Sequence, residues 1–171
     1  MPRFLSPIRV ALCAVLAFPV ALRADDLPAP SGEVLLTITG DIARTNGKGA
    51  ARFDRDMLAA MDPVTFRTET IWTDGPQTFT GPTLSALLDH VSAEGATVTA
   101  TAINDYAVTI PQEDRVATGP IVAYLRNGAP MSVRDKGPLW IVYPYDSDPA
   151  YRTEVIYARS IWQLDRLDVG R

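Results

Sequence analysis

Apolar and polar residues alternate along several short stretches of the chain, as they do in half-buried β-strands. Every second residue of 64–72 falls on one face, and Val98, Ala100 and Ala102 do the same within residues 97–103. β-Branched or densely apolar composition predicts further strands at residues 33–39, 106–110, 139–143 and 160–167. Asn127-Gly128 separates residues 120–126 from 129–133, which predicts a β-hairpin.

Two stretches have the spacing of amphipathic helices instead. Residues 84–91 place their apolar side chains on one helix face, with Thr83 as the predicted N-cap and Gly95 as the predicted end. Asp54 is the predicted N-cap of a shorter helix that reaches residue 61. Strands predominate, so the predicted class is α+β, mostly mixed β-sheets with a few short helices.

The first residues have the pattern of a secretory signal. Arg3 and Arg9 precede or flank an apolar run at residues 10–18, and Ala24 precedes a polar segment. The run is about half as long as a membrane-spanning helix. We therefore expect a cleaved signal peptide at residues 1–24, an extended tail at 25–32, and one domain at 33–171, located in the periplasm without direct membrane insertion after cleavage.

Charge and cysteine content narrow the possible functions. Removal of residues 1–24 would leave 13 basic against 20 acidic residues, a formal charge of −7, which disfavours binding to nucleic acid. Cys13 is the only cysteine and lies in the predicted signal, so the remaining chain has no thiolate for a disulfide, a metal or a nucleophile. Protein or small-molecule partners are expected instead.

Familiar catalytic motifs are absent from the sequence. His90 is the only histidine and is expected on the surface at the end of a helix, so neither a zinc cluster nor a Ser/His/Asp triad is indicated. Asp146-Ser147-Asp148 resembles a cation-binding loop only superficially, because the later acidic ligand is missing. What remains is a set of aromatic and polar residues at predicted strand ends and loops: Trp72, Asn104, Asp105, Tyr106, Arg134, Lys136, Trp140, Tyr143, Tyr145, Tyr151, Arg152, Arg159 and Trp162.

Such a mixture is typical of sites for flat heteroaromatic ligands, since aromatic faces stack on the ring while polar groups pair with its edge. The pattern alone favours a simpler interpretation, in which Trp72, Trp140 and Trp162 belong to the core and the arginines are solvated. Both interpretations remain open at the level of the sequence.

Several motifs occur in a fixed order along the chain: Thr-Gly-Pro-Thr-Leu before a helix, Asn-Asp-Tyr before a strand, an Ala-Tyr-x-x-Asn-Gly hairpin, and Gly-Pro-Leu followed by Val-Tyr-Pro. Together they resemble the molybdopterin-binding domain of the sulfite-oxidase family. The matching segments are residues 66–72, 80–88, 104–111, 123–131, 136–144 and 159–161. The resemblance implies the sulfite-oxidase fold for residues 33–168.

The chain departs from that family at two positions. A family cysteine that binds molybdenum corresponds to the neighbourhood of Glu69 and Thr70, and neither can supply a thiolate. The arginine that follows Pro-Leu in the family is Trp140 here. Cysteine-free exported proteins of this fold bind reduced pterins and act on the sensory domain of a membrane diguanylate cyclase or phosphodiesterase, which couples pterin to cyclic-di-GMP signalling.

The resemblance therefore implies a periplasmic, non-catalytic regulator that binds a reduced pterin without molybdenum. Glu69 or Asp105 would pair with the edge of the pterin, and Trp72, Tyr106 and Trp140 would contact its ring. The remaining expected site residues are Thr70, Asn104, Arg134, Lys136 and Arg159. The alternatives are a molybdopterin-dependent oxidoreductase with a non-cysteine ligand such as Glu69, and a binding protein with an empty pocket.

Overall fold

A computed structural model describes residues 27–170, and the predicted signal peptide at residues 1–24 lies outside them. These residues form a mixed α+β structure built mostly from sheets, as the sequence predicts. The predicted tail is attached to this body: Leu27 is buried, and the backbone N–H groups of Ser31 and Gly32 donate to the carboxylate of Asp54. In the described part of the chain, no helix has the length and apolar character needed to cross a membrane.

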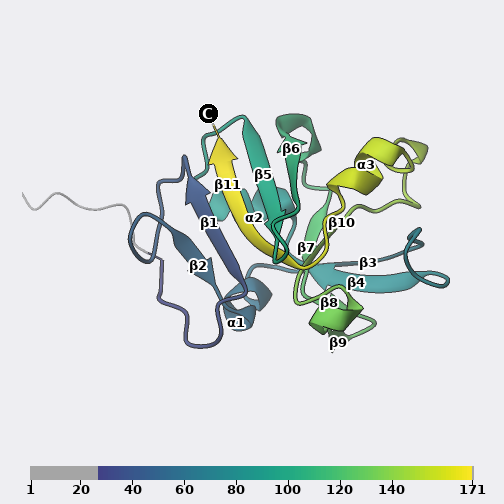
Figure 1. Ribbon diagram of the computed structural model, residues 1–171, viewed down its shortest axis with the longest axis horizontal. Coiled ribbons are helices and arrows are strands. Elements are labelled where there is room, and N and C mark those ends of the chain that lie inside the picture. The colour runs from purple at the N-terminus through teal and green to yellow at the C-terminus, as the bar shows by residue number, and fades with distance from the viewer. Residues whose placement is uncertain (1–26, 171) are drawn as a thin grey trace, which may run out of the picture.

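The largest sheet has five strands in the order β2-β1-β11-β5-β6 (Figure 1). Only β1 and β11 are parallel neighbours, and the other pairs are antiparallel. The predicted alternation in β5 is confirmed, because Val98, Ala100 and Ala102 are buried while the residues between them are partly exposed. The strand bounds are β1 Leu36–Gly40, β2 Ala51–Phe53, β5 Thr97–Ala102, β6 Ala107–Pro111 and β11 Leu164–Gly170.

Two smaller sheets complete the fold beyond β6 (Figure 1). One has the order β3-β4-β8-β9 and the other pairs β7 with β10. The predicted hairpin is confirmed: Asn127 and Gly128 have φ angles of 52° and 77°, the left-handed values that an Asn-Gly turn accommodates. The bounds are β3 Val64–Thr68, β4 Gln77–Gly81, β7 Ile121–Ala123, β8 Leu125–Arg126, β9 Ala129–Pro130 and β10 Trp140–Val142.

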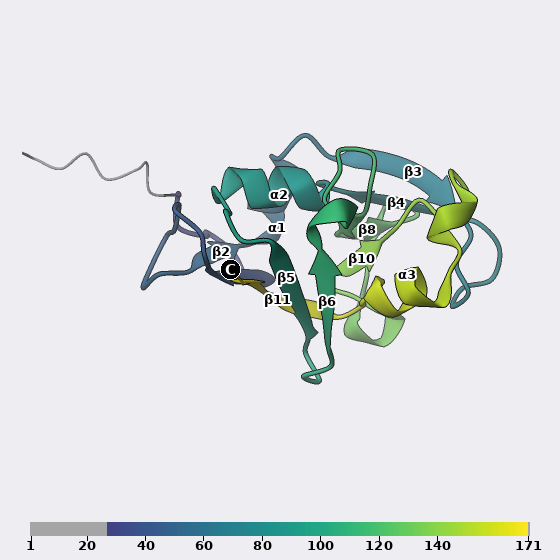
Figure 2. The ribbon, with the colours of Figure 1, turned by 90° about the horizontal axis from the view of Figure 1, so that it is seen from above.

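Three short α-helices pack around these sheets, and α2 lies against one face of the five-stranded sheet (Figure 2). Both predicted N-caps are confirmed, since Asp54 accepts from the Met57 N–H and Thr83 accepts from the Ala86 N–H. The predicted end of α2 at Gly95 is wrong: the helix ends at His90, before a turn at Ser92 with a φ of 52°. The helices are α1 Arg55–Ala59, α2 Leu84–His90 and α3 Glu154–Arg159.

The strand predicted at residues 64–72 is too long. β3 ends at Thr68, where its pairing with β4 ends, and Trp72 lies in the connection that follows. The Thr70 hydroxyl accepts from the Trp72 N–H at 3.2 Å and contacts the Thr73 hydroxyl at 2.7 Å. Such local side-chain bonds compete with strand pairing and favour a turn.

The single strand predicted at residues 160–167 is also wrong. The structure instead has α3 up to Arg159, an irregular link, and β11 from Leu164. Thr153 caps α3, and the Ser160 hydroxyl donates to the Ile156 carbonyl oxygen at 2.7 Å at its end. The apolar residues of this region are therefore divided between a helix and a strand, which periodicity alone did not distinguish.

Candidate binding site

A mostly apolar cavity of about 460 Å³ lies where α3, the β5–β6 turn and the β3–β4 connection meet. Aromatic side chains dominate its wall, with Asn104 and Ser160 as the polar contributions. Cavities of this size and character are typical of sites for small organic ligands. The lining residues are Trp72, Ala102, Asn104, Tyr106, Tyr157, Ala158, Ser160, Ile161 and Trp162.

Trp72 is the centre of an aromatic cluster beside this cavity. Its ring centroid lies 5.3 Å from that of Trp162 and 5.8 Å from that of Tyr157, both in edge-to-face contact. Trp140 lies behind them, 5.9 Å from Trp72 and fully buried. Edge-to-face pairs are favoured because the positive edge of one ring meets the negative face of the next. The cluster therefore presents a rigid aromatic wall.

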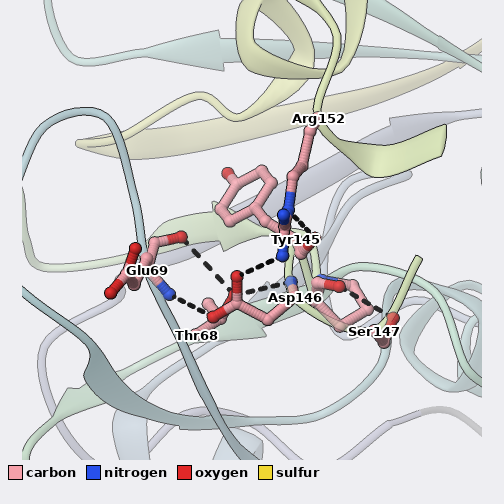
Figure 3. Close-up of polar contacts among 7 residues, drawn as sticks. Thr68, Glu69, Tyr145, Asp146, Ser147 and Arg152 are labelled. Carbon is pink, nitrogen blue, oxygen red and sulfur yellow. Dashed lines mark hydrogen bonds and ion pairs between the residues drawn. The ribbon is translucent and has the colours of Figure 1, made fainter. Parts of the chain in front are cut away.

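Asp146 holds the end of β3, just before the β3–β4 connection that carries Trp72 (Figure 3). The Glu69 N–H donates to Asp146 Oδ2 at 2.8 Å, and the Asp146 N–H donates to the Thr68 hydroxyl at 3.1 Å. Arg152 pairs with Asp146 Oδ1 at 2.8 Å and also donates to the Tyr145 carbonyl oxygen. The two segments are therefore fixed to each other at the positions that precede Trp72.

Both oxygens of Asp146 are thus used within the chain. Asp148, the other acidic residue of this loop, accepts from the Ala150 N–H and caps a 3-10 helix at Pro149–Tyr151. These bonds account for the spacing of Asp146-Ser147-Asp148 without a cation. Among residues 27–170, no three His, Cys, Asp or Glu side chains gather in a way that could hold a metal ion.

A second, polar cleft of about 400 Å³ is also lined by Trp72. Trp72 lines both spaces, and the Lys136 ammonium lies 5.2 Å from the ring centroid of Trp162, which faces the apolar cavity. A cation at this distance from an indole is attracted by the ring. The cleft is lined by Trp72, Thr73, Asp74, Gln77, Arg126, Arg134, Asp135 and Lys136.

Half of the predicted site residues line one of the two spaces. Trp72, Asn104 and Tyr106 line the apolar cavity, and Arg134 and Lys136 line the polar cleft. These residues come from three separate segments of the chain, which the fold brings to two spaces that share Trp72.

The other five predicted residues do not line either space. Trp140 is fully buried, and its indole N–H donates to the Ser160 carbonyl oxygen at 3.2 Å, so it supports the wall from behind. Asp105 is exposed and pairs with Arg166 at 2.6 Å, while Arg159 pairs with Asp114 at 2.9 Å. The remaining two form local hydrogen bonds: the Glu69 N–H donates to Asp146, and the Thr70 hydroxyl accepts from the Trp72 N–H.

Several residues of the two spaces were missed as site residues, among them Trp162, Tyr157 and Arg126. Trp162 belonged to the wider candidate set, whereas Tyr157 and Arg126 did not. The Thr153 cap followed by Glu154 is a helix-start signal that could have revealed α3 and hence Tyr157. Arg126 lies immediately before the Asn127-Gly128 turn, and the sequence carries no signal that this side chain faces Trp72.

Hydrogen bonds behind the aromatic wall tie α3 to its neighbours. Tyr145 donates to the Ser160 hydroxyl at 2.6 Å, and Tyr143 donates to Asp114 at 2.8 Å, beside Arg159. Burial raises the pKa of both tyrosines above the ordinary value, so both phenols stay protonated near neutral pH. His90 lies away from both spaces, partly buried against Phe53, and burial lowers its pKa.

Neither a scan against protein-family models nor a search of curated proteins found a match to this chain.

Proposed function

We propose that this protein binds a reduced pterin in the apolar cavity and acts as a non-catalytic regulator in the periplasm. The observation that carries the proposal is the aromatic wall of a cavity of about 460 Å³, formed by Trp72, Trp162 and Tyr157, with Asn104 at its margin. The pyrimidinone ring of a reduced pterin is flat and contacts aromatic side chains on its faces or edges, while its polar edge needs hydrogen-bond partners. Asn104 offers both a donor and an acceptor for its edge.

The sulfite-oxidase fold is part of this proposal. The ordered motifs described above support it, and so does the position of Trp72 directly after the strand end that corresponds to the family's cysteine. In this chain the backbone at that strand end is bonded to Asp146. A regulator that recognises a pterin ring needs no thiolate at this place, which agrees with a sequence whose only cysteine is Cys13.

The regulatory role extends the same proposal to a protein partner, the periplasmic sensory domain of a membrane diguanylate cyclase or phosphodiesterase. Several large apolar side chains are exposed around the cavity: Tyr106 on its rim is 53% exposed, and Ile103 and Ile71, which adjoin lining residues, are 49% and 61% exposed. Exposed apolar residues gathered near a ligand site are typical of protein contact surfaces. Ligand and partner would then meet at one edge of the molecule.

The alternative is a molybdopterin-dependent oxidoreductase, and the residues present do not fit it. Molybdenum in that family requires a soft thiolate ligand from the protein. Glu69 is exposed at the matching position and lines neither space. Metal analysis of protein purified from a molybdate-replete periplasm discriminates the two functions, and stoichiometric molybdenum would overturn the regulator.

Calorimetric titration of the purified protein with tetrahydropterin under anaerobic conditions tests the proposal directly. We expect saturable binding that Tyr106→Ala weakens and Trp72→Ala abolishes. Tyr106 is exposed, so Tyr106→Ala leaves the core intact. This variant therefore tests binding even if Trp72→Ala impairs folding. Tyr151→Ala, which removes an aromatic ring that lines neither space, is the matched control and should bind normally. Absence of heat, or equal binding by all variants, would reject pterin binding.

A further inference from the structure

The polar cleft gathers three positively charged side chains from two segments of the chain. Arg126 comes from β8, while Arg134 and Lys136 come from the 3-10 helix at Val133–Asp135 and the residue after it. Asp74 and Asp135 also line the cleft, which leaves a formal charge of +1. This local excess of positive charge contrasts with a chain of 16 basic and 20 acidic residues.

None of these three cations forms an ion pair with another described residue. Other arginines, among them Arg152, Arg159 and Arg166, form ion pairs within residues 27–170. The Lys136 ammonium lies over the ring of Trp162, and no hydrogen bond within the described chain uses the guanidinium of Arg126 or Arg134. The Asp135 carboxylate, in contrast, already accepts from the Ser132 hydroxyl at 2.8 Å. The cations of the cleft are therefore the groups left available to a ligand.

The backbone that carries Arg126 is held firmly. Next to it, Asn127 accepts from the Thr78 N–H at 2.9 Å and donates to the Gln77 side chain at 2.7 Å. Gln77 in turn donates to the carbonyl oxygens of Asp74 and Gly75. Residues 74–78 and the turn at Asn127 are thus linked by side-chain amides, which fixes the strand end from which Arg126 projects.

The loop that carries Arg134 and Lys136 is held in a similar way. The Gly137 N–H donates to the Ser132 carbonyl oxygen at 2.8 Å, and the Gln163 N–H donates to the Lys136 carbonyl oxygen at 3.0 Å. The Gln163 side chain also donates to the Val133 carbonyl oxygen at 2.8 Å. A Cβ at Gly137 would lie 2.0 Å from the Met131 carbonyl oxygen, so this close approach requires glycine. Binding groups on a preformed backbone lose little entropy when a ligand arrives.

The cleft and the apolar cavity are adjacent, because Trp72 lines both and Lys136 touches the other tryptophan of the cavity wall. A ligand whose ring lay against Trp72 in the cavity would have the polar cleft next to it. Guanidinium groups bind carboxylate and phosphate oxygens through two parallel hydrogen bonds, and an ammonium adds a point charge. The chemistry of the cleft therefore matches an oxyanion.

We infer that the polar cleft is an anion-binding subsite, in which Arg126, Arg134 and Lys136 hold a carboxylate or phosphate on the side chain of the ligand whose ring lies in the apolar cavity. This inference rests on the proposed pterin function and deepens it: the preferred ligand is a pterin with an anionic substituent. A simple uncharged pterin would occupy only half of the site.

The test compares ligands that share a ring and differ in charge. Calorimetry at low ionic strength would use dihydroneopterin as the uncharged ligand, dihydroneopterin monophosphate as the phosphate source and tetrahydrofolate as the carboxylate source. We expect at least one anionic ligand to bind about tenfold more tightly than dihydroneopterin, a difference of ~1.4 kcal/mol. The advantage should shrink as salt is added, because screening weakens exposed charge pairs.

Two variants assign the effect to the cleft. Arg126→Gln combined with Arg134→Gln should reduce the binding of the anionic ligands to the level of dihydroneopterin, since both side chains line the cleft and neither lines the apolar cavity. Arg67→Gln removes one charge from an exposed position of β3 outside the cleft and should preserve the advantage. The inference is wrong if both anionic ligands bind within about twofold of dihydroneopterin, or if the double variant keeps the preference.

A different result separates this inference from the proposed function. If no pterin binds at all, the proposed function fails. Binding of inorganic phosphate to the cleft then tests the anion-binding subsite independently. An NMR titration with phosphate should shift the side-chain signals of Arg126 and Arg134 saturably, and the double variant should lose the response of neighbouring Gln77. Absence of a saturable shift in the wild-type protein would overturn the anion subsite as well.

Discussion

Trp72 and Trp162 pack edge to face, with ring centroids 5.3 Å apart and ring planes at 71°. They come from segments far apart in the sequence, one from the β3–β4 connection and the other from the link between α3 and β11. Both also line the apolar cavity. One contact therefore joins two distant segments and builds the wall against which a ligand would lie, so stability and binding are linked at this point.

This relationship predicts an energetic coupling between the two tryptophans. In a double-mutant cycle with Trp72→Leu and Trp162→Leu, urea unfolding should give a coupling free energy of about 0.5–1.5 kcal/mol, the range found for aromatic pairs. The control pair is Trp72→Leu with Phe53→Leu, because Phe53 lies on β2 at the far edge of the five-stranded sheet. That pair should be additive, and equal coupling in both cycles would contradict the contact.

A second prediction concerns Asp146. Asp146→Ala should lower the free energy of unfolding by about 1–2 kcal/mol, because the Glu69 N–H loses its acceptor together with the ion pair to Arg152. Arg152→Gln removes the ion pair, which is largely exposed at 51% and 39%, and the bond to the Tyr145 carbonyl oxygen, but it keeps the acceptor of the Glu69 N–H and should cost less than about 1 kcal/mol. Amide hydrogen exchange at Glu69 should accelerate in Asp146→Ala alone. Equal exchange in both variants would show that Asp146 does not hold the end of β3.

The sequence predicted those features of the fold that local chemistry determines. The caps at Asp54 and Thr83 and the Asn127-Gly128 hairpin are confirmed, because each depends on bonds or φ angles within a few residues. The alternation in β5 is also confirmed, since one face of that strand meets a buried core. These elements require no knowledge of distant segments.

Other features depended on distant contacts and were not predicted correctly. The end of β3 is set by its pairing with β4 and by Asp146, 77 positions away from Glu69 in the sequence. Trp140 was expected to contact the ligand, but three other aromatic rings and the Ser160 carbonyl surround it in the core. Residue type alone cannot tell a tryptophan that lines a cavity from one that supports the wall behind it.

A third prediction tests how the N-terminal segment is attached. The Asp54 carboxylate accepts from the N–H groups of Ser31, Gly32 and Met57, and these bonds hold the pKa of Asp54 below its usual value. Asp54→Ala should cost about 2–3 kcal/mol in unfolding free energy, combining a lost helix cap with unsatisfied N–H groups. Asp56→Ala, in the same helix but exposed, is the control and should cost less than about 0.5 kcal/mol.

The effect of Asp54→Ala on stability should depend on pH, because the pKa of Asp54 is lowered in the folded protein. A carboxyl whose pKa is lower in the folded protein contributes stability above its unfolded pKa of 3.8, and the contribution is lost as the pH falls toward the folded pKa. The difference in unfolding free energy between wild type and Asp54→Ala should therefore be constant at neutral pH and narrow below about pH 4. A difference that stayed constant down to acid unfolding would contradict a stabilising role for the ionised carboxylate.

The buried phenol of Tyr143 predicts the opposite behaviour in alkali. Burial first, and then the hydrogen bond to Asp114, raise the pKa of Tyr143 above its ordinary value of 10.0. A group whose pKa is raised on folding contributes stability that is complete below the unfolded pKa and is lost as the pH rises above it. Unfolding free energy should therefore decline from about pH 10 upward, and the decline should be shallower in Tyr143→Phe. At neutral pH the same variant should lose about 1 kcal/mol, the net value of one hydrogen bond.

Tyr106→Phe is the matched control for this alkaline effect, because it removes an exposed phenol from the cavity rim without touching Asp114. Urea unfolding followed between pH 7 and 11 would compare the slopes of the three proteins. If Tyr143→Phe and wild type declined in parallel, the hydrogen bond from Tyr143 to Asp114 would not be the source of the alkaline loss. A shallower slope in Tyr143→Phe alone would assign that loss to the buried phenol behind the aromatic wall.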